Sequence, residues 1–384
     1  MNKKVKISLT GGGSGGHVYP LIAVSQALKT LAAEKGDSLD LGYAGSYGGY
    51  RTLLESNDIR VYKILSSKLR RYFSLSNLIE FPKFVLGFVQ ALGRISTFAP
   101  DVVFSKGGPG ALPVVLAASF LKIPIVIHES DSIPGLTSAI TARFAEKVAV
   151  SFASSEKYFP GKTVLTGNPI RKELLQAVEG KTTEECKKLL GLSSSLPLIL
   201  FIGGSQGAVG INNLVLNNIE KLTKKYQVLH QTGKANYDEV FEKLSSKIET
   251  NGALKDRYKP VPYFDEDMPI ALCGADLIVS RAGAGSVFEI ASFGKPSILI
   301  PLPDSAQNHQ LSNAKEYEES GATLVMEEKE LDSDGFISAI DGIVSDSGKK
   351  EKMSEAALHF LKPNADIEIA KLIYSLLLPR KGFR

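Results

Sequence analysis

The chain has 384 residues, of which 43% are hydrophobic and 22% are charged, and its formal net charge is +4. This length exceeds the usual size of one compact domain, and the composition is that of a globular protein, so we expect two domains. The mild positive charge indicates an anionic partner only weakly, and no nucleic-acid partner is expected.

Short β-branched runs alternate with longer helical patterns along the first part of the chain. This alternation is typical of βαβ units and a parallel sheet. We expect strands at 5–10, 39–45, 61–65, 101–106, 124–129, 147–152 and 162–166, with helices between them.

The same alternation starts again after the turn sequence Gly167-Asn168-Pro169, so residues 167–170 are the expected hinge. Strands are expected near 197–203, 226–231, 258–263, 275–280, 296–301 and 322–326. The predicted fold class is α/β, with two Rossmann-like domains facing across a cleft. We expect an N-terminal domain at 1–166, a C-terminal domain at 167–364, and a C-terminal helix within 365–384 that packs back on the first domain.

A glycine-rich loop, GGGSGG at Gly11–Gly16, follows the first strand and precedes a helix that we expect to open near Pro20. Glycines let backbone N–H groups approach a phosphate or a sugar closely, and the helix N-terminus adds partial positive charge. Five glycines exceed what a tight turn requires, so the loop favours ligand binding.

The spacing of Gly11, Gly13 and Gly16 formally matches the dinucleotide pattern G-x-G-x-x-G. That pattern also requires an acidic residue at the end of the second strand, where this chain has Tyr43-Ala44-Gly45-Ser46. A dinucleotide oxidoreductase is therefore disfavoured. A P-loop is excluded because His17-Val18 follows the glycines in place of Lys and Ser/Thr.

Two further glycine turns, SKGGPG at Ser105–Gly110 and GGSQG at Gly203–Gly207, each close a strand and open a helix. Ligands of open α/β folds bind at the carboxyl ends of the strands. The turns therefore predict a nucleotide-linked donor in one half and an acceptor in the other.

Six collinear motifs cover nearly the whole chain: GGSGGHVYP at 12–20, HESDSIPGLT at 128–137, TGNPIR at 166–171, GGSQG at 203–207, SRAGAGSVFE at 280–289 and NHQLSNA at 308–314. The set closely resembles the MurG family of glycosyltransferases. The resemblance implies a GT-B fold and inverting transfer from UDP-N-acetylglucosamine to the C4 hydroxyl of lipid I, the undecaprenyl-diphosphate-linked N-acetylmuramoyl-pentapeptide. It implies lipid II of peptidoglycan synthesis as the product, with a β-1,4 linkage.

Carried over by position, the resemblance assigns donor binding to Ser14, Gly15, Gly16, Arg171, Ser205, Asp265, Ala284, Gly285, Ser286, Glu289 and Gln310, and acceptor binding to Gly107, Gly108 and Asp131. Arg171 can fork onto a diphosphate, and Glu289 can accept both ribose hydroxyls of uridine. Ser14, Asp131 and His309 depart from the commonest family pattern. Asp131 could instead cap the following helix.

Inverting transfer needs a base for the acceptor hydroxyl, and His17 and Glu129 are the two candidates. His17 could alternatively only hydrogen-bond the acceptor or the loop. No cluster of Asp, Glu or His has the spacing of a divalent-cation site, so neither metal nor cofactor is expected. Arg171, helix N-termini and backbone donors would stabilise the departing diphosphate.

The segment 63–98 combines basic residues with an apolar helix. Leu78, Val85 and Leu92 suffice to pack on the sheet, while the surplus apolar and basic side chains predict contact with an anionic membrane surface. The residues assigned to this contact are Arg70, Arg71, Phe81, Phe84 and Phe88.

Two widely spaced cysteines, no secretion signal and no run of roughly 18 apolar residues indicate a peripheral protein on the cytoplasmic side of the membrane. The main alternative function is a UDP-N-acetylglucosamine 2-epimerase, against which the basic, Phe-rich segment argues. A non-catalytic sugar-nucleotide or lipid-binding protein is the third possibility.

Overall fold

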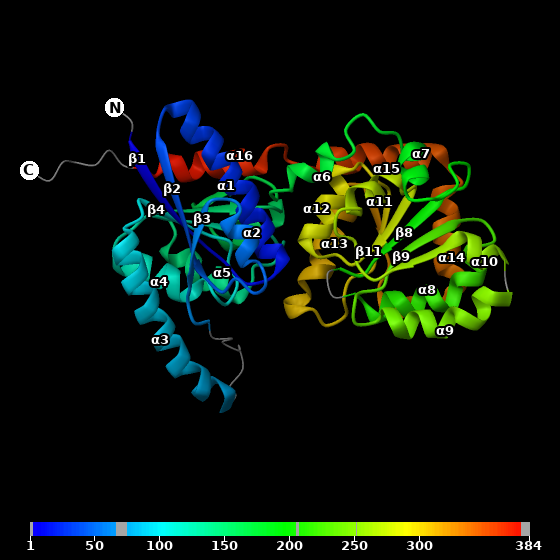
Figure 1. Ribbon diagram of the computed structural model, residues 1–384, viewed down its shortest axis with the longest axis horizontal. Coiled ribbons are helices and arrows are strands. Elements are labelled where there is room, and N and C mark those ends of the chain that lie inside the picture. The colour runs from blue at the N-terminus through cyan, green and yellow to red at the C-terminus, as the bar shows by residue number, and fades with distance from the viewer. Residues whose placement is uncertain (1–2, 67–74, 205–206, 251, 378–384) are drawn as a thin grey trace, which may run out of the picture. The chain divides into compact units, whose positions relative to one another are not determined.

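The computed structural model describes residues 3–66, 75–204, 207–250 and 252–377 (Figure 1). Its contacts divide the chain into two compact units. The first unit comprises Met1–Arg171 and Lys362–Arg384, and the second comprises Lys172–Leu361. The chain therefore passes from the first unit to the second directly after the segment TGNPIR and returns near its carboxyl end.

The first unit is built on a seven-stranded parallel sheet with strand order β3-β2-β1-β4-β5-β6-β7. The order reverses between β1 and β4, and ligands of open α/β sheets bind at such a switch point. The loops after these two strands are GGGSGG and SKGGPG. The strands are β1 Lys4–Thr10, β2 Ser38–Gly45, β3 Ile59–Lys63, β4 Val102–Ser105, β5 Ile125–Glu129, β6 Lys147–Val150 and β7 Thr163–Leu165.

Helices cover both faces of this sheet. The helices are α1 Gly15–Lys35, α2 Arg51–Glu55, α3 Leu75–Phe98, α4 Leu112–Phe120, α5 Leu136–Thr141 and α16 Ala365–Ser375, with 3-10 turns η1 Ala142–Phe144 and η2 Ala153–Tyr158. α16 lies beside α1 (Figure 1), and its Ile369 and Ile373 are buried in the same core cluster as Val5 and Leu9 of β1. The end of the chain thus completes the core of the first unit.

The helix after the first glycine loop begins earlier than expected. α1 starts at Gly15, with Ser14 in an extended conformation at its N-cap, and Pro20 lies inside it. A proline inside a helix lacks its own N–H, and its ring meets the carbonyl of the residue four positions earlier. That residue is Gly16. Pro20 therefore lies just after the first turn of α1. The expectation that Pro20 opens the helix is wrong.

The second unit repeats the architecture with a six-stranded parallel sheet in the order β10-β9-β8-β11-β12-β13. The α/β class with two Rossmann-like parallel sheets is thereby confirmed. The switch point lies between β8 and β11, next to the loop GGSQG. The strands are β8 Leu198–Ile202, β9 Gln227–Gln231, β10 Tyr258–Val261, β11 Leu277–Ser280, β12 Ser297–Leu299 and β13 Thr323–Val325.

The helices of the second unit include α7, which begins at a complete capping box between Thr182 and Glu185. The core lies between the sheet and α8 and α14. The helices are α6 Lys172–Gln176, α7 Thr183–Leu189, α8 Val209–Leu222, α9 Tyr237–Thr250, α10 Gly252–Arg257, α11 Met268–Gly274, α12 Ala284–Ser292, α13 His309–Glu319, α14 Ser333–Val344 and α15 Ser347–Phe360, with 3-10 turns η3 Ala306–Asn308 and η4 Glu328–Glu330.

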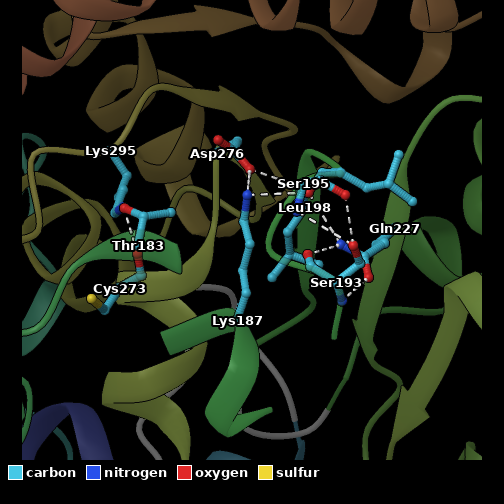
Figure 2. A network of polar contacts seen from close by, with 10 residues as sticks. Thr183, Lys187, Ser193, Ser195, Leu198, Gln227, Cys273, Asp276 and Lys295 are labelled. Carbon is cyan, nitrogen blue, oxygen red and sulfur yellow. Dashed lines mark hydrogen bonds and ion pairs between the residues drawn. The ribbon is translucent and has the colours of Figure 1, made fainter. Parts of the chain in front are cut away.

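A buried ion pair joins α7 to the amino-terminal edge of this sheet (Figure 2). Lys187 Nζ lies 2.6 Å from Asp276 Oδ2, and the Lys187 side chain is only 4% exposed. The ammonium also donates to Leu196 O at 3.1 Å, and Asp276 Oδ2 accepts from Leu198 N at 2.8 Å. The pair therefore fixes α7 against the start of β8.

Replacing Lys187 with Met is expected to destabilise the second unit by about 3–5 kcal/mol, because Asp276 would be left without its counter-charge. Chemical denaturation measures this loss. Lys188→Met is the matched control, since Lys188 is the exposed neighbour on α7, and its free energy of unfolding should stay close to that of the wild type. Equal stability of the two variants would contradict a stabilising role for the pair.

Candidate functional site

His17 lies on the first turn of α1, where the glycine loop has just ended. Its Nδ1 is 2.7 Å from Ser14 Oγ, which fixes the orientation of the ring. Burial, and secondly the positive charge of Lys106, lower the pKa of His17 to about 4. At neutral pH the imidazole is therefore uncharged and can accept a proton.

Glycines on both sides leave room for this imidazole. A Cβ on Gly12 would lie 2.9 Å from His17 Nδ1, and a Cβ on Gly108 would lie 2.9 Å from His17 Nε2. Gly108 also has φ +84, a conformation that L side chains rarely adopt. The two glycine loops at the switch point thus hold the histidine between them.

Glu129 ends β5 and is only 4% exposed. Its carboxylate accepts from Asp131 N at 3.0 Å and from Gly135 N at 3.2 Å, and the Ser138 hydroxyl is a further partner. Burial and the negative charge of Asp131 raise the pKa of Glu129, whereas the hydrogen bonds from Asp131 N and the Ser138 hydroxyl lower it in part. The carboxylate therefore organises the loop that follows β5.

A cavity of about 320 Å³ lies over the carboxyl ends of β4 and β5. Both candidate bases, His17 and Glu129, line it. Its other polar walls include Lys106, Asp131, Thr137 and Ser138, and its apolar walls include Leu112, Leu136 and Ile140. Of the residues assigned to the acceptor, Gly108 and Asp131 line the cavity. Gly107 lies next to Ser138, because a Cβ added to Gly107 would be 3.0 Å from Ser138 Oγ.

The alternative that Asp131 caps the next helix is wrong. The N-cap of α5 is Gly135, and Asp131 lies four residues earlier, in the loop held by Glu129. Both oxygens of Glu129 accept hydrogen bonds from the backbone of this loop. Asp131 is thus a half-buried residue of the cavity wall.

Arg171 is the last residue of the first unit before the chain crosses to the second. Its guanidinium stacks over the ring of Tyr19 on α1, 4.3 Å from the ring centroid. Such a stack fixes the plane of the guanidinium. Tyr19 in turn meets Tyr50 edge to face, with ring centroids 5.7 Å apart. The first unit therefore positions the arginine that the sequence assigned to the donor.

In the second unit, three of the seven assigned donor residues lie at the start of α12. Gly283 is its N-cap, and Ala284, Gly285 and Ser286 form its first turn. This end lies at the carboxyl edge of the sheet, because α12 follows β11 closely. Glu289 is half-buried one turn further along, so the helix carries both backbone donors and a carboxylate acceptor.

Gln310, at the start of α13, closes the loop that follows β12. Its Oε1 accepts from Leu302 N at 3.0 Å. Three residues of this loop, Asp304, Gln307 and Asn308, have left-handed φ values between 54° and 59°. Non-glycine residues adopt this conformation at a cost and are concentrated at functional sites. The side-chain oxygen of Gln310 thus shapes the loop, and its amide nitrogen is the group that can donate to a ligand.

Two other loops at the same edge are tied by Gln231, the last residue of β9. Its Nε2 donates to Gly204 O at 3.0 Å, and its Oε1 accepts from Phe264 N at 3.1 Å. Asp265, assigned to the donor, is exposed directly after this anchor. The assigned Ser205 lies outside the described residues.

Two family matches divide the chain as the two sheets do. Residues 7–150 match the N-terminal domain of glycosyltransferase family 28, and residues 198–370 match its C-terminal domain. A relative from Clostridium tetani is 38% identical over 341 residues, which cover 88% of this chain and 89% of the relative. Its name is UDP-N-acetylglucosamine--N-acetylmuramyl-(pentapeptide) pyrophosphoryl-undecaprenol N-acetylglucosamine transferase. The chain belongs to the MurG family of glycosyltransferases.

Solved structures agree with the MurG family fold. MurG from Acinetobacter baumannii matches with a TM-score of 0.72 at 24% identity, over 97% of this chain and 99% of that one. A UDP-GlcNAc 2-epimerase from Neisseria meningitidis, bound to UDP-GlcNAc, matches with a TM-score of 0.68 at 14% identity, over 97% and 99%. The fold is thus shared by transferases and epimerases. The sequence relatives, which are named as transferases, distinguish between these two classes for this chain.

The helix that we predicted to contact the membrane is α3, which projects from the first unit (Figure 1). The prediction of which side chains of α3 face the sheet and which face outward was partly wrong. Val85, expected against the sheet, is 43% exposed, whereas Phe88 packs on the core cluster that contains Ile95. The surplus apolar face consists of Phe81, Val85, Leu86 and Val89, between 43% and 61% exposed.

The other residues assigned to the membrane behave differently. Phe84 is half-buried, and Arg70 and Arg71 lie outside the described residues. The exposed face differs from the expected one because Gly87, directly beside Leu65 O, seats the helix with Phe88 inward. Within the described residues, no helix combines the length and the hydropathy that crossing a membrane requires.

Sequence reasoning missed two charged residues in this MurG family member. Lys106 follows β4 and is 3% exposed in the cavity wall. Arg281 follows β11, donates to Ile300 O and Pro301 O at 3.1 Å each, and pairs with Glu328 Oε2 at 2.6 Å. The signal for both was the same: a basic residue directly after a short apolar strand, where a parallel sheet presents its carboxyl end.

Proposed function

We propose that this protein transfers N-acetylglucosamine from UDP-N-acetylglucosamine to the C4 hydroxyl of lipid I and forms lipid II. The observation that carries the proposal is the identity of 38% to a transferase of that name over nearly the full length of both chains. The cavity with a neutral histidine at the first switch point is consistent with it, since inverting transfer needs a base beside the acceptor hydroxyl.

His17 is the proposed base. In the tautomer in which Nδ1–H donates to Ser14 Oγ, Nε2 is the unprotonated nitrogen and is the atom that can accept the proton. Glu129 is better suited to hold the loop, because both of its oxygens already accept backbone hydrogen bonds. His17 therefore takes the proton from the acceptor hydroxyl as the bond to the sugar forms.

The donor is proposed to bind at the carboxyl edge of the second sheet. The first turn of α12 supplies backbone N–H groups for the diphosphate, and Glu289 accepts the ribose hydroxyls. Gln310 and Asp265 contribute from the neighbouring loops. Ser205, Arg171, Ser14, Gly15 and Gly16 are the remaining residues that the family resemblance assigns to the donor.

The exposed face of α3 is proposed to rest on the cytoplasmic surface of the membrane that holds the acceptor. Phe81, Val85, Leu86 and Val89 form one continuous apolar strip on a projecting helix. Burying such a strip at a bilayer surface is favourable, and neighbouring exposed lysines, Lys63 among them, add attraction to anionic lipids.

Replacing Phe81 and Val89 together with Gln should lower binding to phosphatidylglycerol vesicles about tenfold or more, because two side chains no longer bury apolar surface. Co-sedimentation measures the change. Leu189→Gln is the control, since Leu189 is a 59% exposed apolar residue on α7 of the second unit. Equal vesicle binding by the double variant and the wild type would contradict docking through α3.

Parallel reactions distinguish the proposed transfer from epimerisation. UDP-N-acetylglucosamine is incubated alone and with a short-chain lipid I analogue, and UDP release is followed together with the sugar configuration. Transfer predicts UDP release that depends on the acceptor. An epimerised sugar nucleotide in the absence of acceptor would favour the epimerase instead.

A further inference from the structure

Lys106 is a buried basic residue in the wall of the first unit's cavity. It follows β4 directly, and its backbone N–H donates to Thr10 O at 2.9 Å, which joins the two strands of the switch point. Gly107 and Gly108 come next with φ +77 and +84, so the chain turns sharply away behind it. The side chain is 3% exposed and lines the cavity.

Within the described part of the chain, Lys106 Nζ makes neither a hydrogen bond nor an ion pair, although an ammonium carries three donors. Buried charges normally have such partners, because losing hydration without replacing it is costly. The unused donors border the cavity, where a ligand can reach them.

The charges around the cavity indicate which ligand atoms fit. Glu129 and Asp131 attract Lys106 and partly offset the effect of burial, which lowers its pKa. The other titratable neighbours are His17 and His128, and burial together with Lys106 lowers the pKa of both. Two carboxylates beside one ammonium disfavour a diphosphate here, because a like charge inside an enclosed site is repelled.

We propose that Lys106 is an acceptor-binding residue that donates hydrogen bonds to uncharged oxygen atoms of the acceptor sugar: a hydroxyl, an ether or an amide carbonyl. Thr137 and Ser138 supply further hydroxyls, and Leu112 and Ile140 supply the apolar surface on which a sugar face packs. This inference rests on the proposed function. It adds that Lys106 holds the acceptor sugar beside His17 and leaves the diphosphate outside the cavity.

Steady-state transfer to a short-chain lipid I analogue tests the proposal with Lys106→Met. Losing hydrogen bonds from a charged donor should raise the acceptor KM about tenfold to hundredfold and leave the donor KM within about twofold of the wild type. Inhibition by inorganic pyrophosphate should be unchanged. Lys106→Gln retains a neutral donor and should restore part of the acceptor affinity.

Lys157→Met is the matched control, since Lys157 is an exposed lysine of the same unit, and its kinetics should equal those of the wild type. An unchanged acceptor KM in Lys106→Met would overturn the proposal, as would weaker pyrophosphate inhibition, which would place the diphosphate on Lys106. If Lys106→Met does not fold, Lys106→Gln decides by the same criteria. Wild-type protein without any transfer would refute the proposed function itself.

Discussion

His17→Ala is expected to lower kcat about 10²–10⁴-fold, because transfer would lose the base that accepts the proton of the acceptor hydroxyl. The affinity for UDP-N-acetylglucosamine should remain close to that of the wild type, since His17 is proposed to act on the acceptor hydroxyl and is not among the proposed donor residues. Single-turnover transfer and calorimetric donor binding measure the two effects. Ser14→Ala should cost less, because it only frees the ring that Ser14 orients.

The pH dependence gives an independent check on this histidine. Protonated imidazole cannot accept a proton, so kcat/KM should fall below the pKa of His17, which lies near 4 in the free protein. The expected profile is therefore flat from neutral pH down to about 5. An acid limb near the ordinary histidine value of about 6.5 would contradict the buried, neutral ring. His359→Ala, at an exposed histidine of α15, is the matched control and should keep full turnover.

Glu289→Ala is expected to weaken donor binding about tenfold to hundredfold, because the ribose hydroxyls would lose a charged acceptor. Turnover at saturating donor should change little, since the ribose lies away from the bond that breaks. Calorimetric titration with UDP and with UDP-N-acetylglucosamine measures the loss, which should be similar for both ligands.

Glu319→Ala serves as the comparison for Glu289, because Glu319 is an exposed glutamate at the end of α13. Its donor affinity should match the wild type. Normal UDP binding by the Glu289 variant would remove this residue from the donor site. A loss for UDP-N-acetylglucosamine but not for UDP would move Glu289 from the ribose to the sugar.

Much of the fold could be predicted from the sequence because parallel strands buried on both faces are short, nearly continuous apolar runs. Each expected strand is present, and its ends differ from the expected ones by at most two residues. The start of α1 was misjudged because Gly15 and Gly16 are poor helix formers, whereas Pro20 is a common first-turn residue. In the structure, the packing of the helix against the core outweighs these local preferences.

The candidate site was predictable only in outline. Glycine turns after β1 and β4 indicated a ligand site at the carboxyl ends of the strands, and His17 and Glu129 do line one cavity. The roles of side chains depend on tertiary contacts that spacing cannot supply. Glu129 accepts hydrogen bonds from the loop backbone, and Lys106 is buried in the cavity wall. On α3, Phe88 packs on the core, whereas Val85 is exposed.

The most direct test of the central claim is transfer of radiolabelled N-acetylglucosamine from its UDP donor to a short-chain lipid I analogue, with the lipid product isolated and its linkage determined. We predict a labelled β-1,4-linked disaccharide lipid that requires both substrates and is lost in His17→Ala. Folded protein that binds UDP but yields no labelled disaccharide lipid would contradict the account.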